Sequence, residues 1–144
     1  MKVASILKHK GAHVETIRPD APVRSAVWAL QLKGIGALVV SDDDRTVLGI
    51  VSERDVVRGL TEHGAGLLTL PVSRLVTAPA VTCAPDDAIT AVMQVMTRHR
   101  ARHLPVIDHG RLAGIVSIGD VVKHRLDEMQ LEADVLREAL IVSH

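Results

Sequence analysis

The apolar residues of the chain change their spacing in a fixed order. A short segment at residues 14–17, with Val14 and Ile17 at its ends, predicts a strand, and apolar residues at helical spacing between 23 and 30 then predict a helix. Two further apolar runs, at 37–40 and 47–51, lie on either side of three aspartates and predict a β-hairpin. A second helix is expected from Arg54. The first half of the chain therefore predicts the order β-α-β-β-α.

The second half of the chain repeats this order. Strands are predicted at residues 80–83, 104–107 and 112–116, a helix at 89–96, and a second helix from Gly119. The predicted fold class is therefore α/β (α+β), built from tandem β-α-β-β-α repeats.

The repeat is also visible in the residues themselves. Pro19-Asp20 corresponds to Pro85-Asp86 at an offset of 66. The sequence GIVSERD at residues 49–55 corresponds to GIVSIGD at residues 114–120 at an offset of 65. The difference of one residue falls in a predicted turn, where insertions and deletions are tolerated.

Segments at the ends of the chain also have apolar periodicity. Residues 1–8 predict a lead-in helix, and residues 120–142 predict one long helix with an apolar stripe that continues beyond the second repeat. Such a stripe is expected to cap the module or to contact another chain. The predicted organisation is a first repeat at 10–60, a linker at 61–75, a second repeat at 76–126 and a C-terminal helical extension at 127–144.

Composition limits the classes of partner. Lys and Arg together number 17, as do Asp and Glu, and this balance argues against nucleic acid or an anionic membrane as the main partner. No apolar run approaches the about 20 residues that a membrane span needs. Trp28 stands without any Phe or Tyr, so an RNA-binding platform of stacked rings is not expected. The single cysteine, Cys83, is expected in the core and fits a cytoplasmic location.

A Ser-x-x-Asp segment lies at the predicted strand-to-helix junction of each repeat, as Ser52 with Asp55 and as Ser117 with Asp120. One interpretation is a helix-capping box, in which the serine accepts from backbone N–H groups and the acid favours the helix N-terminus. The other interpretation is a ligand site. There the helix N-terminus attracts phosphate, the serine hydroxyl donates to a phosphate oxygen and the aspartate accepts from ribose hydroxyls. The sequence leaves both interpretations open.

Taken together, the Pro-Asp openers, the LPVID strand at residues 104–108 and both GIVS-x-x-D segments resemble the CBS-domain family. The two repeats are similar to a Bateman module, and the whole chain is similar to small stand-alone bacterial CBS-domain proteins. This resemblance implies a pseudo-two-fold pair of repeats with two clefts between them. Each cleft would hold an adenine nucleotide such as AMP, ATP or NAD(H). It further implies a regulatory function without catalysis, a homodimer, and a regulated protein that the sequence does not name.

The resemblance assigns residues to the two clefts by position. The first cleft takes Ser117, Asp120, Arg102, His103, Lys10, Val14, Glu15, Ile35, Gly36 and Ala37. The second cleft takes Ser52, Arg54, Asp55, Ala80 and Val81. Because Arg102 adds a cation near the phosphate end, the first cleft is expected to be the stronger nucleotide site.

Other functions are weighed on the same sequence. A nucleotide-hydrolysing enzyme or enzyme subunit is one alternative, but no P-loop or nucleophile elbow is evident. A purely structural interaction protein with vestigial clefts is another. His9 with His13, and His99 with His103, have the four-residue spacing of metal ligands on a helix, but no third ligand is assigned. We therefore expect no catalytic residues, no catalytic cofactor and no metal site.

Overall fold

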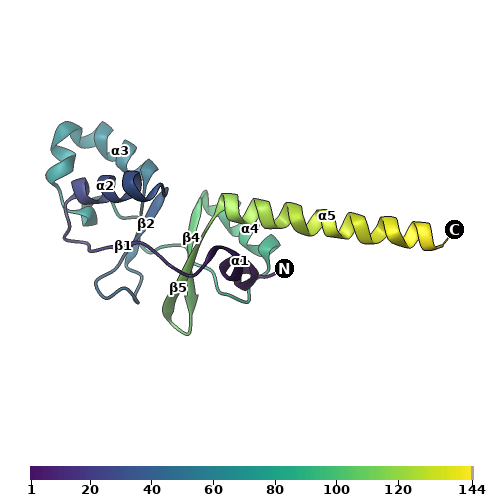
Figure 1. Cartoon of the computed structure of the whole chain (residues 1–144). Coiled ribbons are helices and arrows are strands. Elements are labelled where there is room, and N and C mark those ends of the chain that lie inside the picture. Colours follow the sequence, from purple (N-terminus) through teal and green to yellow (C-terminus); the bar gives the residue numbers. More distant parts are fainter. Residues whose placement is uncertain (144) are drawn as a thin grey trace.

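Helices and strands follow each other in the predicted order (Figure 1). The structure is a computed structural model and describes residues 1–143. The first half contains α1 (Val3–Lys10), β1 (Thr16–Ile17), α2 (Val23–Lys33), β2 (Ala37–Val40), β3 (Gly49–Ser52) and α3 (Glu53–His63). The linker contains the 3₁₀ helices η1 (Gly64–Thr69) and η2 (Val72–Arg74). The second half contains α4 (Ile89–His99), β4 (His103–Asp108), β5 (Arg111–Ser117) and α5 (Ile118–Val142). The predicted α/β class is confirmed.

Each half contains its own small sheet. In the first half, β2 lies between β1, to which it is parallel, and β3, to which it is antiparallel. In the second half, β4 and β5 form an antiparallel hairpin with an irregularity between Val106 and Ile107. In both halves, the middle strand of the repeat is thus joined to the strand that leads into the second helix.

The predicted strand at residues 80–83 is wrong. Only Cys83 pairs with β4, and its N–H donates to the Pro105 carbonyl at 3.0 Å. At the equivalent place in the first half, the Val39 N–H donates to the Glu15 carbonyl at 3.2 Å. The corresponding donor in the second half would be Pro105, which has no N–H. The ladder therefore does not extend from Cys83 toward the residues before it.

The ends of several elements differ from the prediction by one or two residues. β1 begins at Thr16 rather than at residue 14, and β3 begins at Gly49 rather than at residue 47. Helices α3 and α5 each begin one residue earlier than predicted. The serine that ends each preceding strand is the helix N-cap, so strand and helix meet without an intervening loop.

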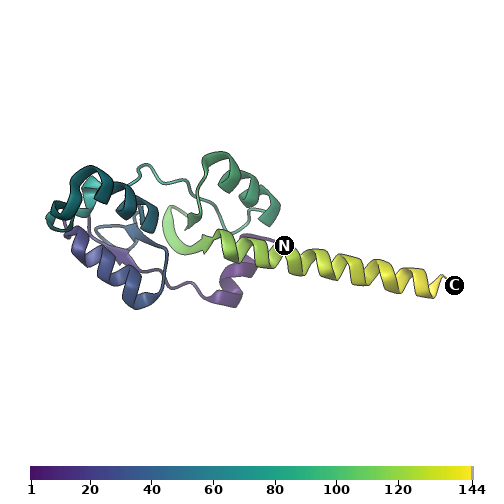
Figure 2. The same cartoon turned by 90° about the horizontal axis from the view of Figure 1, so that it is seen from above.

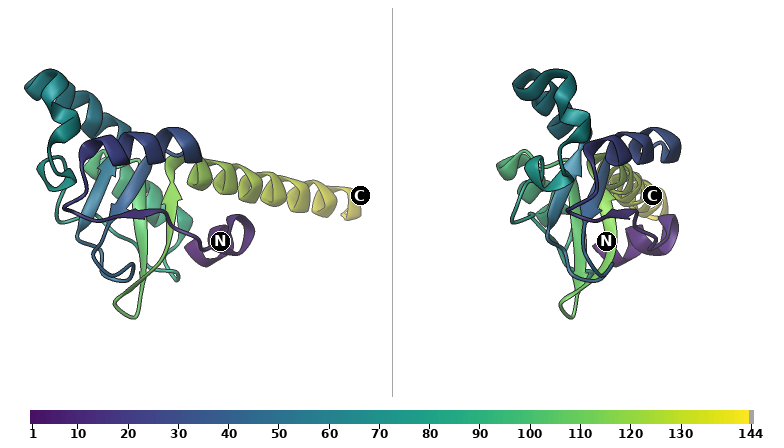
Figure 3. Two further views of the ribbon diagram at one scale, coloured as in Figure 1. Left: turned by 60° about the vertical axis from the view of Figure 1, so that its left-hand side comes forward. Right: turned by 90° about the vertical axis from the view of Figure 1, so that its left-hand side faces the viewer.

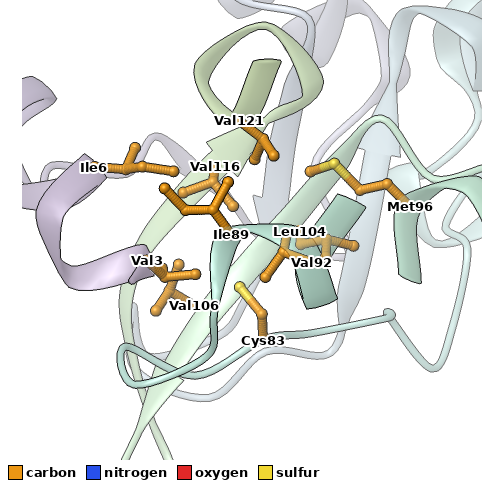
Figure 4. Close-up of a cluster of buried hydrophobic side chains, with 10 residues drawn as sticks. All are labelled: Val3, Ile6, Cys83, Ile89, Val92, Met96, Leu104, Val106, Val116 and Val121. Carbon is orange, nitrogen blue, oxygen red and sulfur yellow. The ribbon is translucent and has the colours of Figure 1, made fainter. Parts of the chain in front are cut away.

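The apolar side chains form two cores, one in each half. The first core joins α2, β2 and β3 to the linker through Leu67 and Leu75. The second core includes α1, because Val3 and Ile6 pack with residues of α4, β4 and β5 (Figure 4). Cys83 lies in the second core as predicted, and its burial raises the pKa of the thiol to about 12. The lead-in helix therefore packs on the second repeat, across the length of the chain.

Helix α5 projects away from the rest of the chain (Figures 1 and 2). Its contacts are with α4, β5 and α1, and Val121 is the one buried residue within its described length. The left view of Figure 3 shows it leaving the region where the strands of the two halves lie. Within residues 1–143, no helix is both long enough and apolar enough to span a membrane.

Candidate ligand-binding cavities

Two cavities lie between the halves, and each is lined by residues of both. We call them the Ser52 cavity, of about 370 Å³, and the Ser117 cavity, of about 450 Å³. Each takes a helix N-terminus from one half, and the end of a helix with the start of the next strand from the other half. Lys33 of the Ser117 cavity and His99 of the Ser52 cavity are 66 residues apart and hold equivalent places. The internal repeat therefore builds two equivalent cavities.

The Ser117 cavity brings together most residues assigned to the first cleft. Its predicted lining residues are Lys10, Val14, Glu15, Ile35, Gly36, Ala37, His103 and Ser117. Asp120 lies beside this lining and is hydrogen-bonded to Lys10. His13, Lys33, Gly34 and Ile115 complete the wall; His13 falls within the segment 10–15 that family position assigned to this cleft, and the other three were not assigned. The repeat contains a signal for Lys33 and Gly34: at the offset of 66 they correspond to His99 and Arg100, which line the other cavity.

Arg102 is a correction to the predicted grouping. It lines the Ser52 cavity and is absent from the lining of the Ser117 cavity, although His103 contributes to both. Arg102 therefore lines the same cavity as Arg54 and Arg100, and not the cavity of Ser117.

The Ser52 cavity holds four of the five residues assigned to the second cleft. These are Ser52, Arg54, Asp55 and Val81, whereas Ala80 lines neither cavity. Thr77 also lines this cavity and falls within the segment 76–81 that family position assigned to it. Further lining residues that the sequence did not place there are Gly36, Ile50, Glu53, Arg58, His99, Arg100, Ala101, Arg102 and His103. Arg58 follows Asp55 by three residues on a helix, and this spacing is a signal for a side-chain pair.

The capping-box interpretation holds at Ser52. The Ser52 hydroxyl accepts from the Asp55 N–H, and the Asp55 carboxylate accepts from the Ser52 N–H at 2.8 Å. The same carboxylate accepts from the Ser52 hydroxyl at 3.0 Å and from Arg58 at 2.8 Å, and Thr77 lies at 3.4 Å. Both oxygens of this buried carboxylate are therefore engaged by the protein itself.

A second capping box at Ser117 leaves its carboxylate less occupied. One oxygen of Asp120, Oδ2, accepts from the Ser117 N–H at 2.9 Å and from the Lys10 Nζ at 2.7 Å. Within residues 1–143, the other oxygen forms no hydrogen bond. Burial opposes ionisation of Asp120, but the bonds from Lys10 and Ser117 outweigh it and lower its pKa. Asp120 is thus an ionised group with one oxygen open to a ligand donor.

The arginines of the Ser52 cavity differ in their partners. Arg58 is paired with Asp55. Arg54, Arg100 and Arg102 form no salt bridge within residues 1–143. Arg54 comes from the first turn of α3 in one half, and the other two come from the segment between α4 and β4 in the other half. Three arginines without a salt bridge in the described chain therefore line one cavity at a helix N-terminus, an arrangement suited to an anion.

The cations of the Ser117 cavity are largely neutralised within the chain. The Lys10 ammonium is bonded to Asp120, and also to the Ile115 carbonyl at 3.1 Å. The Lys33 ammonium lies 3.9 Å from Glu15. A hydrogen bond from His13 at 2.8 Å, supported by Lys33, lowers the pKa of Glu15 despite its desolvation. The Ser117 cavity therefore has less free positive charge than the Ser52 cavity.

His103 forms part of the wall of both cavities and packs against Gly36. A Cβ atom at Gly36 would lie 3.0 Å from the Cε1 and Nε2 atoms of the His103 ring. Burial lowers the pKa of His103, which favours the neutral ring. The pair Gly36–His103 is thus the boundary that the two cavities share. Within residues 1–143, no group of three His, Cys, Asp or Glu side chains is placed to hold a metal ion.

The chain as a whole is similar to known proteins. The family model described as "CBS domain" matches residues 3–62 and 72–127. A crystal structure of a CBS-domain containing protein from Agrobacterium tumefaciens is 44% identical, covers 87% of this chain and 99% of its own, and superposes with a TM-score of 0.84. A mitochondrial CBS domain-containing protein of Arabidopsis thaliana is 31% identical over 91% of this chain and 70% of its own length.

A more distant structure bears on the fold alone. The CBS domain pair of protein MJ0100 is 20% identical, covers 89% of this chain and 98% of its own, and superposes with a TM-score of 0.78. That protein was solved in complex with 5′-methylthioadenosine and S-adenosyl-L-methionine. Its similarity shows that the paired arrangement of repeats is the same in both chains.

Proposed function

We propose, from the premise that this chain belongs to the CBS-domain family and carries the domain twice, that it is a regulatory module that binds adenine nucleotides. The observation that carries the proposal is the group of Arg54, Arg100 and Arg102, which face the Ser52 cavity without a carboxylate partner within residues 1–143. Unpaired guanidinium groups in a cleft favour a ligand with phosphate. The N-terminus of α3 adds backbone N–H groups, which also favour a phosphate.

The Ser52 cavity is proposed as the nucleotide site for AMP, ATP or NAD(H). Arg54 and Ser52 lie at the helix end where a phosphate would bind. The apolar side chains of Ile50 and Val81 line the same cavity and can pack against the two faces of a purine. The capping contacts of Asp55 leave it poorly suited to accept from ribose hydroxyls, so this cavity contacts mainly the phosphate of its ligand.

The Ser117 cavity is proposed to hold an adenosine compound with little or no phosphate. Asp120 offers a free carboxylate oxygen for a ribose hydroxyl, and the cations nearby are already paired. Val14 and Ile35 supply an apolar surface for the base. The complex of protein MJ0100 supports this proposal, since it shows that a CBS pair of the same fold can hold adenosine compounds that lack phosphate.

Titration calorimetry with AMP, ATP, NADH and GMP tests the proposal. We expect AMP to bind more tightly than GMP, and we expect Arg102→Gln to weaken ATP binding by at least about tenfold, as loss of a charge-assisted contact does. The matched control is Arg98→Gln, because Arg98 lies on the exposed surface of α4 and lines neither cavity. This control variant is expected to bind ATP like the wild type.

The same experiment separates the proposal from its alternatives. An absence of binding by all four nucleotides at millimolar concentration would favour a structural interaction protein with vestigial clefts. Release of phosphate from ATP with turnover would favour a hydrolase. Equal losses in the Arg102→Gln and Arg98→Gln variants would show that general surface charge, and not the Ser52 cavity, attracts the nucleotide. Mass spectrometry of nucleotides that co-purify with the chain would name the natural ligand.

A further inference from the structure

We infer that α5 forms a parallel coiled coil with α5 of a second copy of the chain. The apolar residues on one face of α5 are spaced four and three apart in strict alternation over almost three heptads. They occupy the inner positions of a heptad repeat and are all exposed: Val122, Leu126, Met129, Ala133, Leu136 and Leu140. A spacing that averages 3.5 residues is the pattern of a left-handed coiled coil, and a helix that packs on a globular core usually has a broader stripe.

This stripe is not covered by the chain that carries it. The side chains of Leu126, Leu136 and Leu140 are 59%, 66% and 63% exposed. α5 projects beyond the other helices and strands, as Figure 2 shows, and Val121 is the one buried residue within its described length. In proteins, tertiary packing of an apolar face supplies most of the stability of a helix. A second helix along the stripe would supply that packing.

Charge complementarity identifies the partner as another copy in parallel orientation. Glu132 and Arg137 lie at the two positions that flank the stripe and face each other across a parallel pair. Within one chain they form no salt bridge with each other, and Glu132 lies 3.7 Å from Arg125, two turns earlier on the same helix. In a parallel pair, Glu132 of each copy meets Arg137 of the second copy, and this gives two equivalent ion pairs. The antiparallel arrangement would place Arg137 opposite Gln130 or another Arg137 and leave it unpaired.

The expected pairing is testable by the mass of the full chain in solution. Light scattering at micromolar concentration should give twice the 15.5 kDa of one chain. Leu136→Glu should reduce this to the monomer mass, because it places a carboxylate in the stripe. Leu131→Glu is the matched control: Leu131 is similarly exposed, at 60%, but lies on the opposite side of the helix from the stripe. A monomeric wild type, or a dimer that survives Leu136→Glu, would overturn the inference.

Cysteine cross-linking tests the orientation. Leu140→Cys should form a disulfide between two copies under mild oxidation, since equivalent stripe residues meet in a parallel pair. Glu138→Cys, outside the stripe on the same turn, should not. The natural Cys83 is buried, so the wild type should stay unlinked. If Leu140→Cys links to Val122→Cys of another copy and not to itself, the pair is antiparallel and the inference fails, because these positions are about 27 Å apart along one helix.

Exchanging the charges of Glu132 and Arg137 tests the ion pair while the apolar stripe stays unchanged. Arg137→Glu should weaken the dimer, because it sets Glu132 against a glutamate of the second copy. Combining it with Glu132→Arg should restore the dimer, since the ion pair is rebuilt with its signs reversed. Failure of the double variant to recover would remove the charge argument. Unchanged far-ultraviolet circular dichroism in each variant would confirm that the fold of the two repeats is retained.

Discussion

The Lys10 ammonium lies 2.7 Å from a carboxylate oxygen of Asp120, although the two residues are 110 positions apart in the sequence. The contact joins the last residue of α1 to the capping box of α5. In the other capping box, Arg58 on the same helix supplies the cation to Asp55. The two repeats therefore neutralise equivalent aspartates from different sources. A ligand in the Ser117 cavity would lie at the place where α1, the second hairpin and α5 meet.

Lys10→Met should lower the free energy of unfolding by about 1 kcal/mol, the scale of a partly exposed ion pair. The effect should depend on pH. The folded pKa of Asp120 is lowered below its usual 3.8, so the contribution is fully present above that value and is lost as the pH falls through the folded pKa. Urea unfolding of both proteins at neutral and acidic pH checks this. A stability difference that persists unchanged at the acidic end would contradict it.

Asp55→Ala and Asp120→Ala should affect different properties. Asp55 is buried with both oxygens engaged, so its removal should cost about 2 kcal/mol or more of stability and leave an unpaired Arg58. Asp120→Ala should cost about 1 kcal/mol of stability. It should also weaken the binding of adenosine compounds at least about tenfold, because a ribose acceptor is lost. Melting temperatures without ligand, together with calorimetry, separate the two effects.

The opposite pattern of effects in these two variants would contradict the assignment of the cavities. If Asp120→Ala has a lower melting temperature but binds adenosine compounds normally, the second GIVS-x-x-D segment serves only as a helix-capping box. If Asp55→Ala folds stably and loses nucleotide binding, the carboxylate of Asp55 serves the ligand and not the capping box. Asp55→Asn is the control that keeps the size of the side chain.

His103 should make stability depend on pH near neutrality. Burial is the main cause that lowers its pKa below the usual 6.5. The nearby charges of Lys10 and Arg102 also lower this pKa, whereas those of Glu53 and Asp120 raise it. The unfolded chain therefore binds the proton more readily, and the stability contributed by the neutral ring falls as the pH drops below about 6.5. His103→Gln should lose less stability than the wild type between neutral and mildly acidic pH. Thermal melts across that range, for both proteins, give the comparison.

Gly36→Ala should alter ligand binding in both cavities at once. The added methyl group would lie 3.0 Å from the ring of His103, which must shift by a few tenths of an ångström, and that ring lines both cavities. Gly66→Ala is the control, since Gly66 has open space around it and lines neither cavity. Calorimetry with ATP and with 5′-methylthioadenosine would report the two sites. A change confined to one ligand would show that the ring does not connect them.

Local patterns predicted most of the fold. The hairpins, the helices and both capping boxes depend on residues near each other in the sequence, so periodicity and spacing located them to within three residues at either end. The missing strand before Cys83 also had a local signal, because Pro105 cannot donate the ladder bond that Val39 donates in the first half.

The distribution of charge between the cavities was less predictable from the sequence. The placement of Arg102 depends on which cavity a residue just before β4 lines, and the Lys10–Asp120 pair depends on how α1 packs on the second core. Neither has a short-range signature. Family position grouped Arg102 with Ser117, whereas Arg102 lines the Ser52 cavity.

Helix α5 starts in the wall of the Ser117 cavity, at the residue after Ser117, and continues for 25 residues. At about 1.5 Å per residue this is a rod of about 37 Å, so a rotation of about 5° at its base would move its far tip by about 3 Å. A small change of angle where α5 meets the Ser117 cavity would therefore be amplified along the helix. The far end of α5 is the part of the chain that would move most in response to a ligand bound there.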